Sequence, residues 1–303
     1  MIQHILVPLD GSTLAEAALP FASALANQLG ASITLIHVIE KNAPKDIHGE
    51  HHLSNPDEAC AYLDQLASKS LPQGIRVEQH VHTTEVSNVA RSIVEHAGEF
   101  SPDLIVMCSH GSGGLRDLLV GNIAQQVIAR GTTPVLLIHP QSDIPPVFRC
   151  RKLLVPMDGK TSHEHGLDIA VELGRAFQAE LTLLFVVPTR GTLGGHQAAT
   201  GMLLPSTMTA LLDMNEQAAL EYLSQQAARF GKIDVPIQKT VLRGDPSSAI
   251  AEFASREHAD MIVLGTHGKS GTDAFWNGSV APKLTGLTRI PLLFVPVSPA
   301  EKK

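Results

Sequence analysis

The amino-acid sequence predicts an α/β protein built from two tandem, doubly wound domains. The chain has 303 residues, about twice the length of an average domain. Residues 4–11 return in similar form at 152–159, and in both copies short apolar runs alternate with longer segments of helical period. Continuous apolar runs indicate strands covered on both faces. Right-handed crossovers then give each copy a parallel sheet of about five strands with helices on either side.

The composition fits this class and argues against several others. Apolar residues make up 44% and charged residues 17% of the chain, as expected for globular layers built from aliphatic side chains. The net charge of −7 argues against binding to nucleic acid, because neutralising phosphates requires a surplus of Lys and Arg. Cys60, Cys108 and Cys150 lie far apart and form no CxxC pair, so neither a disulfide framework nor a thiolate zinc site is expected.

We expect neither a secretion signal nor a membrane span. The first residues lack a basic stretch followed by a long apolar run and lead straight into a strand pattern. No apolar run approaches the roughly 18 residues needed to cross a bilayer. The sequence therefore predicts a cytoplasmic protein.

The repeat orders the predicted strands. The first strand, near residues 4–8, and the second, near 33–38, return 148 residues later. The fourth strand, near 103–108, and the fifth, near 133–138, return 157 residues later. The second copy has therefore gained nine residues between its second and fourth strands, where several glycines predict a long loop.

Segments of helical period separate the strands, for example residues 15–29 and 216–230. The helix that follows the inserted loop carries an apolar stripe that predicts packing on the sheet, and the stripe comprises Leu211, Leu212, Met214, Ala218, Ala219, Tyr222 and Leu223. We place the first domain at residues 1–140, a linker with two prolines at 141–149, and the second domain at 150–303.

A glycine-rich loop in the second copy predicts a phosphate-binding site. The strand at 261–264 is followed by Gly265 and Gly268, and then by Gly278 and Ser279 at the start of a helical segment. A strand that turns through glycines into a helix presents bare backbone N–H groups to an anion, and the serine hydroxyl can donate to phosphate. The alternative is that the glycines form a tight turn and Ser279 caps the helix.

Two further residues are expected at the same edge of the sheet. Asp158 follows the first strand of the second copy, and Val186 ends the second strand. Ligands of such folds bind at the carboxyl ends of the strands. The Asp158 carboxylate can accept a hydrogen bond from an exocyclic amine, and the backbone at Val186 can bind the edge of a base. The alternative for Asp158 is a turn and helix cap.

Together these residues resemble the motif of the universal stress protein family in its tandem two-domain form. The resemblance covers nearly the whole chain. It implies a flavodoxin-like, Rossmann-like sheet of five parallel strands in the order 3-2-1-4-5, and ATP as the ligand of members with the full motif. It also implies that residues 135–138 and 292–295 pair the two copies as edge strands, and that chains form a homodimer.

The resemblance also assigns the site residues of the second copy. Asp158 and the backbone of Val186 would hold adenine, whereas Gly265, Gly268, Gly278 and Ser279 would hold ribose and phosphates. His267 follows the fourth strand and is expected to position phosphate or a divalent ion such as Mg²⁺. The segment 244–246 resembles the loop that follows the third strand in the family.

The first copy departs from the motif. It keeps Asp10, Val38, Gly111 and Gly121, but Cys108 replaces the first motif glycine and Asn122 replaces the serine. A side chain at Cys108 is expected to crowd the approach to the ligand, although Asn122 can still donate a hydrogen bond. The first domain is therefore expected to bind nucleotide weakly or not at all.

A histidine cluster at residues 48–52 has two interpretations. Three imidazoles and a carboxylate within five residues offer ligands for zinc. Neighbouring side chains rarely converge on one ion, so a solvated loop is the favoured interpretation. His163 and His165, near the start of the first helix of the second copy, carry less weight.

The sequence favours an ATP-binding regulatory protein of the stress response, because a full binding motif occurs without a catalytic triad. One alternative is a slow ATP hydrolase that uses Asp158 and His267 to place a metal and a water molecule. The other is an interaction or lipid-binding module whose nucleotide loop is vestigial. The protein partners are not specified by the sequence.

Overall fold

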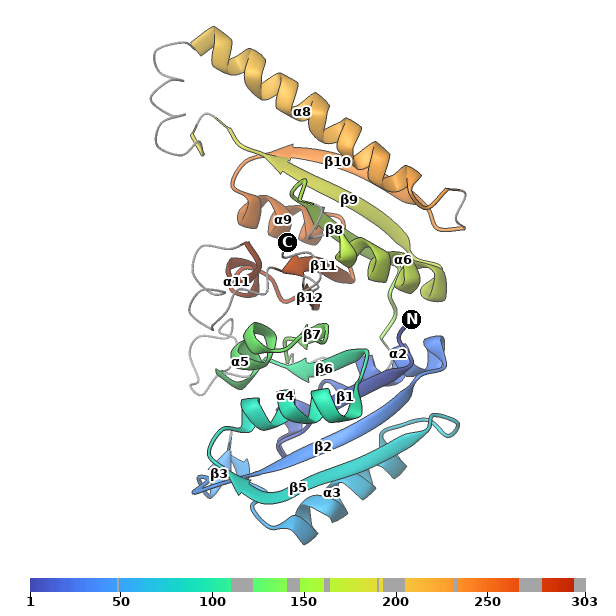
Figure 1. The fold of residues 1–303 in the computed structure, drawn as a ribbon, viewed down its shortest axis with the longest axis vertical. Coiled ribbons are helices and arrows are strands. Elements are labelled where there is room, and N and C mark those ends of the chain that lie inside the picture. Colours follow the sequence, from blue (N-terminus) through green and yellow to red (C-terminus); the bar gives the residue numbers. More distant parts are fainter. Residues whose placement is uncertain are drawn as a thin grey trace.

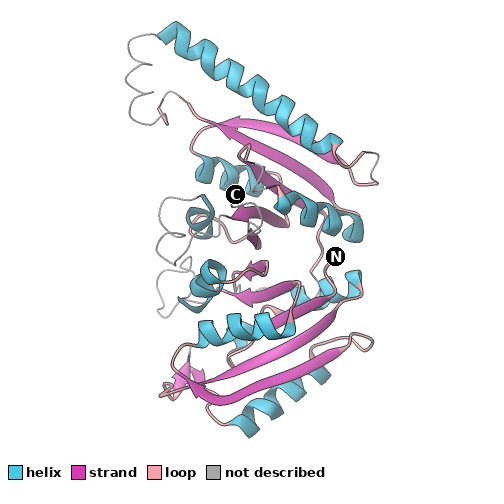
Figure 2. Cartoon of the chain, in the orientation of Figure 1, coloured by secondary structure: helices cyan, strands magenta, loops and turns pink. Residues whose placement is uncertain are grey.

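A single sheet runs through the whole molecule (Figure 1). The computed structural model describes residues 1–47, 49–109, 122–140, 148–160, 164–189, 191–192, 205–231, 234–266 and 280–296. Helices cover both faces of the sheet, as the secondary-structure colours of Figure 2 show.

The elements of the first half follow one another in the predicted alternation of strands and helices. They are β1 (His4–Pro8), α1 (Thr13–Glu16), α2 (Leu19–Leu29), β2 (Ser32–Glu40), β3 (Asp46–Ile47), β4 (Glu50–His51), α3 (Pro56–Lys69), β5 (Val77–Val86), α4 (Val89–Phe100), β6 (Leu104–Cys108), α5 (Asn122–Arg130) and β7 (Val135–Ile138).

The second half repeats this order without the small β3–β4 hairpin among its described residues. Its elements are β8 (Lys152–Met157), α6 (His165–Phe177), β9 (Glu180–Val187), α8 (Pro205–Ala228), β10 (Ile237–Arg243), α9 (Pro246–Arg256), β11 (Met261–Thr266), α11 (Val280–Thr285) and β12 (Leu292–Pro296).

The strand order confirms the predicted fold class. The large sheet has the order β10-β9-β8-β11-β12-β7-β6-β1-β2-β5, so each half has five strands in the order 3-2-1-4-5. All neighbours within a half are parallel, whereas β12 and β7 pair antiparallel, with Leu292 opposite Leu137 and Phe294 opposite Val135. The two copies are thus joined through the edge strands expected from the sequence.

Packing between the helices adds to this junction. The Phe148 ring lies between α2 and α6, with its centroid 4.6 Å from that of Phe21 and 6.3 Å from that of Phe177. All three rings are buried or half-buried. Aromatic pairs at these separations stabilise by about 1 kcal/mol beyond the apolar area that they bury.

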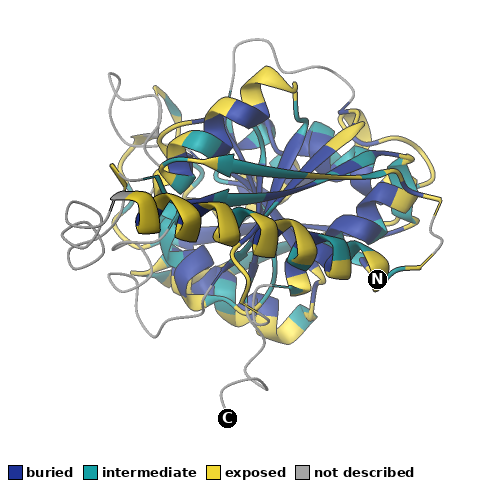
Figure 3. Ribbon diagram, turned by 90° about the horizontal axis from the view of Figure 1, so that it is seen from above, coloured by how far each residue is buried: buried dark blue, intermediate teal, exposed yellow. Residues whose placement is uncertain are grey.

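The core forms two layers, one on each face of the sheet. Successive residues of a strand point to opposite faces, so Val106 joins the cluster under α2, while Ile105 and Met107 join the cluster under α4. Figure 3 shows the buried residues gathered in the strands and on the inner faces of the helices. The continuous burial of β6 agrees with its continuous apolar sequence.

The strand registers locate the difference in length between the copies. Val77 and Ile237 start equivalent strands and pair with Ile33 and Leu181, so the second copy has gained twelve residues before β10. It has then lost three residues before α9, because β5 has ten residues and β10 has seven. The net gain is the nine residues expected from the sequence.

Helix α8 corrects one prediction. It lies along β9 and β10, and its buried face includes Leu212, Ala219 and Leu223. Leu211 and Met214 are 44% and 68% exposed, and Ala218 is exposed too, so the prediction that the whole stripe packs on the sheet was wrong for these three residues. They lie roughly 100° or more around the helix from Leu212, outside the stripe that reaches the strands.

No helix of the described part of the chain is both long and apolar enough to cross a membrane.

Candidate functional site

The carboxyl ends of β8, β9 and β11 bring three of the predicted site residues to one edge of the sheet. Met157 pairs with Phe185, so Asp158 and Val186 are the next residues in the same register. Gly265 lies near the end of β11, which is the other neighbour of β8. The remaining predicted residues, His267, Gly268, Gly278 and Ser279, lie outside the described residues.

Asp158 is exposed and forms a turn with Lys160. Its Oδ1 accepts a hydrogen bond from the Lys160 backbone N–H at 3.1 Å, and its Oδ2 lies 3.2 Å from the Lys160 ammonium. The turn interpretation of Asp158 is therefore correct in this structure. An ion pair at this exposure stabilises by less than about 1 kcal/mol, so a ligand amine can compete with Lys160 for the carboxylate.

An aromatic pair lies beside Asp158. A Cβ on Gly159 would lie 3.7 Å from the Phe185 ring, an ordinary contact distance. The centroids of Phe185 and Tyr222 are 6.1 Å apart with nearly perpendicular planes. The sequence alone indicates a strand position for Phe185 and a helix-stripe position for Tyr222. Their shared position beside Asp158 depends on the packing of α8 against β9.

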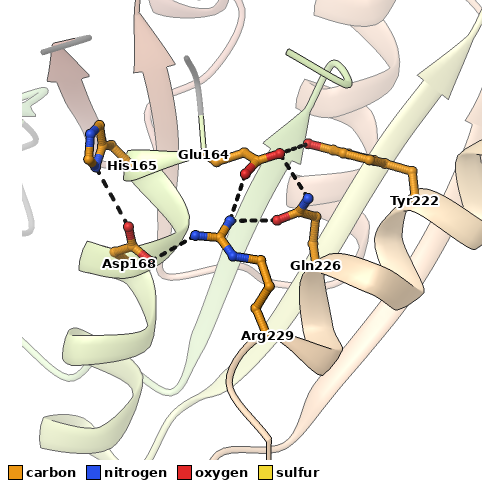
Figure 4. Close-up of polar contacts among 6 residues, drawn as sticks. All are labelled: Glu164, His165, Asp168, Tyr222, Gln226 and Arg229. Carbon is orange, nitrogen blue, oxygen red and sulfur yellow. Dashed lines mark hydrogen bonds and ion pairs between the residues drawn. The ribbon is translucent and has the colours of Figure 1, made fainter. Parts of the chain in front are cut away.

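A half-buried carboxylate joins the start of α6 to α8 (Figure 4). Glu164 Oε1 accepts hydrogen bonds from the Tyr222 hydroxyl at 3.2 Å and from Gln226 Nε2 at 2.8 Å. Glu164 Oε2 accepts from Arg229 at 2.7 Å, and Arg229 also lies 3.8 Å from Asp168. Burial and the Glu164 charge raise the pKa of Tyr222, which therefore stays a neutral donor.

The start of α6 also contacts the predicted glycine loop. A Cβ on Gly166 would lie 3.2 Å from the backbone nitrogen of Gly265. This distance is tighter than most real contacts, so a glycine at 166 allows the helix to approach the end of β11 closely. The helix position thus depends on small residues on both sides of the contact.

The segment 244–246 forms the start of α9 at the same edge. The Gly244 N–H donates to the Val187 carbonyl at 3.0 Å, and Asp245 caps the helix by accepting from the Ser248 N–H at 3.1 Å. This hydrogen bond lowers the pKa of Asp245, which is the expected behaviour of a helix cap.

In the first domain the corresponding edge is covered by the chain itself. A Cβ on Gly11 would lie 2.8 Å from Leu53 Cδ1, whereas among the described residues a Cβ on the equivalent Gly159 would meet only the Phe185 ring, at 3.7 Å. The two ring nitrogens of the buried His37 lie 2.8 Å from the Leu9 carbonyl and 2.9 Å from the Leu53 carbonyl. Leu53 is therefore held over the end of β1, close to Asp10.

The covering segment is also bound to α1. The Glu50 carboxylate accepts hydrogen bonds from the Thr13 N–H at 2.7 Å and from the Thr13 hydroxyl at 2.6 Å. His52 is buried, and burial lowers its pKa. The favoured prediction of a solvated loop at 48–52 was therefore wrong for His52, which is buried, and for Glu50, which is half-buried and anchored by Thr13. His51 is exposed and lies 3.4 Å from Glu58, and His48 lies outside the described residues.

The two residues at which the first copy departs from the motif, Cys108 and Asn122, lie in different environments. The Cys108 sulfur is buried and faces the Ala18 backbone N–H, at the places equivalent to Gly265 and Gly166. Burial raises the pKa of the Cys108 thiol. Val38 is also buried, and Asn122 is exposed at the start of α5, where its amide oxygen accepts from Gln126 at 2.8 Å. Gly111 and Gly121 lie outside the described residues.

Comparisons with known proteins agree on one family. A model of the universal stress protein family matches residues 1–139 and again residues 149–296. Universal stress protein Rv2623 of Mycobacterium tuberculosis is 23% identical over 303 residues, covering 95% of each chain. Universal stress protein MJ0531 of Methanocaldococcus jannaschii is 30% identical over 145 residues, which cover 48% of this chain and 81% of that protein.

A solved structure shares the complete two-domain fold. PA1789 of Pseudomonas aeruginosa PAO1, described as functionally unknown, covers 98% of this chain and 93% of its own, with a TM-score of 0.69 and 17% sequence identity. At this identity the similarity shows the fold alone.

Proposed function

The chain belongs to the universal stress protein family in its tandem two-domain form, and we propose that it is an ATP-binding regulatory protein whose nucleotide site lies in the second domain. The contrast between the two copies carries this proposal. The first copy has Cys108 in place of the motif glycine and Leu53 packed tightly over Gly11, whereas the second copy keeps Gly265, and among the described residues a Cβ on Gly159 would meet only the Phe185 ring at an ordinary contact distance.

The proposed site uses groups of two kinds. Asp158 accepts a hydrogen bond from the adenine amine, and the backbone of Val186 contacts the base edge. The motif glycines and Ser279 contact ribose and phosphates through N–H and hydroxyl groups, with His267 beside the phosphates and Mg²⁺ as their counter-ion. ATP occupancy then biases the conformation of the second domain or its affinity for partner proteins.

The described residues supply positioning groups rather than reactive ones. The carboxylates nearest this edge, those of Asp158 and Glu164, are engaged by Lys160 and by the donors from α8. Such groups bind and orient a ligand, and a regulatory role needs nothing more. A slow hydrolase would release phosphate, which the experiment below also measures.

Titration of purified protein with ATP and Mg²⁺ tests the proposal. We expect one site per chain and loss of binding in Gly268→Val, because a branched side chain blocks the close approach of phosphate. The matched control is Gly111→Val at the equivalent position of the first copy, which should leave binding unchanged. Two sites, no site, or equal effects of the two variants would contradict the proposal. Phosphate release above that of buffer would support the hydrolase instead.

The proposal also covers the domain boundaries, the cellular location and the assembly state. We take the domain boundaries as 1–140 and 150–303, which agree with the gap between the two family matches. We also propose a cytoplasmic protein that assembles as a homodimer of chains, with neither nucleic acid nor membrane as a partner. Light scattering at several protein concentrations measures the assembly state.

A further inference from the structure

Three histidines gather on the outer strand of the first domain. His80 and His82 lie on β5, two residues apart and therefore on the same face of the sheet. His96 lies on α4, which covers that face, and its ring centroid is 4.8 Å from that of His80 and 4.9 Å from that of His82. One ligating nitrogen of each ring lies within 4.8 Å of the other two.

We propose that His80, His82 and His96 bind a divalent transition-metal ion, with Zn²⁺ as the ion that three imidazoles suit best. A tetrahedral zinc site with Zn–N bonds of about 2.0–2.1 Å holds its nitrogens about 3.3 Å apart. Side-chain rotations that bring the three nitrogens about 1.5 Å closer together produce that spacing. The fourth position is then available to water, since His80 and His82 are half-exposed.

The hydrogen bonds of the cluster leave ligating nitrogens available. His96 is buried, and its Nδ1 lies 2.8 Å from the Ser92 carbonyl, an acceptor that requires Nδ1 to carry the proton. The Nε2 lone pair of His96 is therefore free to bind a metal. A ring N–H donated to a backbone carbonyl is also the usual way in which a metal-binding histidine is oriented.

His80 adds an unpartnered nitrogen to the site. Its Nε2 is buried and has no hydrogen-bond partner. A buried polar atom without a partner costs about 1–3 kcal/mol, and a bound metal ion removes that cost. The Phe100 ring lies 5.0 Å from the His80 ring and 5.5 Å from the His96 ring, which keeps one side of the cluster apolar.

The surroundings of His80 favour its neutral form, the form in which an imidazole binds a metal. Burial lowers the pKa of His80, and the neighbouring His96 and His82 lower it further, whereas the nearby Glu99 carboxylate opposes the shift. Protonation of one ring disfavours protonation of the next, because the charges would lie close together. A neutral imidazole offers its nitrogen lone pair to a cation without first releasing a proton.

The second copy shows that the fold does not require these histidines. The equivalent strand positions lie opposite equivalent residues of β2 and β9, and the helix positions lie eight residues after the N-cap. The equivalents of His80, His82 and His96 are Thr240, Leu242 and Phe253. Phe253 is buried as His96 is, so an apolar ring fills this place equally well. Packing alone therefore does not explain three imidazoles in one copy.

The test uses untagged, full-length protein treated with a chelator and then titrated with Zn²⁺ without nucleotide. We expect one tight site per chain and a rise of roughly 5–10 °C in the Tm of the first domain at 100 times the Kd. His82→Leu and His96→Phe, which introduce the residues of the second copy, should each weaken this site more than about 100-fold. The exposed His165→Ala serves as the control and should bind as the wild type does.

Two measurements keep the proposal falsifiable. Circular dichroism shows whether each variant is folded, and the triple variant His80→Thr, His82→Leu, His96→Phe should be folded without tight zinc binding. Co²⁺ should give the intense visible absorption of a four-coordinate ion in the wild type only. Equal zinc affinity in wild type and triple variant, or only the weak absorption of hydrated Co²⁺, would overturn the proposal. Neither result depends on ATP binding in the second domain.

Discussion

The side chain of Leu53 lies against Gly11 so closely that a Cβ on Gly11 would be 2.8 Å from two of its carbon atoms. The Leu53 carbonyl is held at the same time by the buried His37 ring. The first domain thus covers its own ligand edge with a segment that follows β4, whereas among the described residues of the second domain a Cβ on the equivalent Gly159 would meet only the Phe185 ring at an ordinary contact distance. The asymmetry of the two copies therefore involves a physical cover as well as a changed motif.

Substitution of the two equivalent glycines should reveal this cover. Gly11→Ala is expected to destabilise by about 2–4 kcal/mol, because the new methyl clashes with Leu53 and the backbone has φ +93°. Gly159→Ala, with φ +77° and no clash, should cost only about 1–2 kcal/mol. Urea unfolding of both variants measures the difference. Equal losses would contradict the close contact between Leu53 and Gly11.

Removal of the Glu164 carboxylate should destabilise the second domain. Glu164→Ala leaves Gln226 and Arg229 without their shared acceptor, and we expect a loss of about 2–4 kcal/mol. Tyr222→Phe removes one hydrogen bond and should cost about 1 kcal/mol. The control Asp168→Asn lies at an exposed ion pair and should cost under about 0.5 kcal/mol. Thermal unfolding ranks the three variants, and any other order contradicts this assignment.

The alternation of strands and helices was predictable because it depends on local patterns, whereas the strand order and the edge pairing were implied by the family resemblance. Continuous apolar runs such as residues 104–107 identify buried parallel strands, and the repeat supplies a second example of each. The positions of Asp158, Val186 and Gly265 follow from the rule that parallel strands end at one edge.

The cover and the histidine cluster were not predictable, because both depend on contacts between distant segments. Leu53 is an isolated apolar residue in a polar stretch, and nothing near it in the sequence points to Gly11. His80 and His96 are sixteen residues apart, and only the packing of α4 over β5 brings their rings together. A comparison of the two copies offers one usable signal, since Phe253 stands where His96 does.

A thiol reagent should distinguish the exposed Cys60 from the buried Cys108 and Cys150. Cys60 is exposed, whereas burial raises the pKa of both Cys108 and Cys150 and keeps them protonated. We expect a thiol reagent at pH 8 to modify one cysteine of the native protein and all three after unfolding. Cys60→Ser should abolish the native reaction. Rapid modification of Cys108 in the folded protein would show that its environment is open rather than buried.

His139 should make the stability of the junction between the domains depend on pH. This buried ring lies 2.8 Å from the Ser109 hydroxyl, and burial, aided by the Arg289 charge, lowers its pKa to about 4. Between that value and the ordinary value of 6.5, the unfolded chain binds a proton that the folded protein does not. The contribution of a neutral His139 is therefore complete above about pH 6.5 and is lost as the pH falls toward 4.

Urea unfolding at pH 7.5 and pH 5 measures this dependence. From the shift in pKa, the wild type should lose about 2 kcal/mol through this residue, and His139→Asn should lack that part of the loss because its side chain does not titrate. The exposed His165→Asn is the control and should follow the wild type. Other histidines with lowered pKa values, such as His52 and His80, change the unfolding free energy equally in the wild type and in both variants. The difference in pH dependence between wild type and His139→Asn therefore measures the contribution of His139. The same pH dependence in His139→Asn and wild type would mean that the folded protein accepts a proton at this ring near its ordinary pKa.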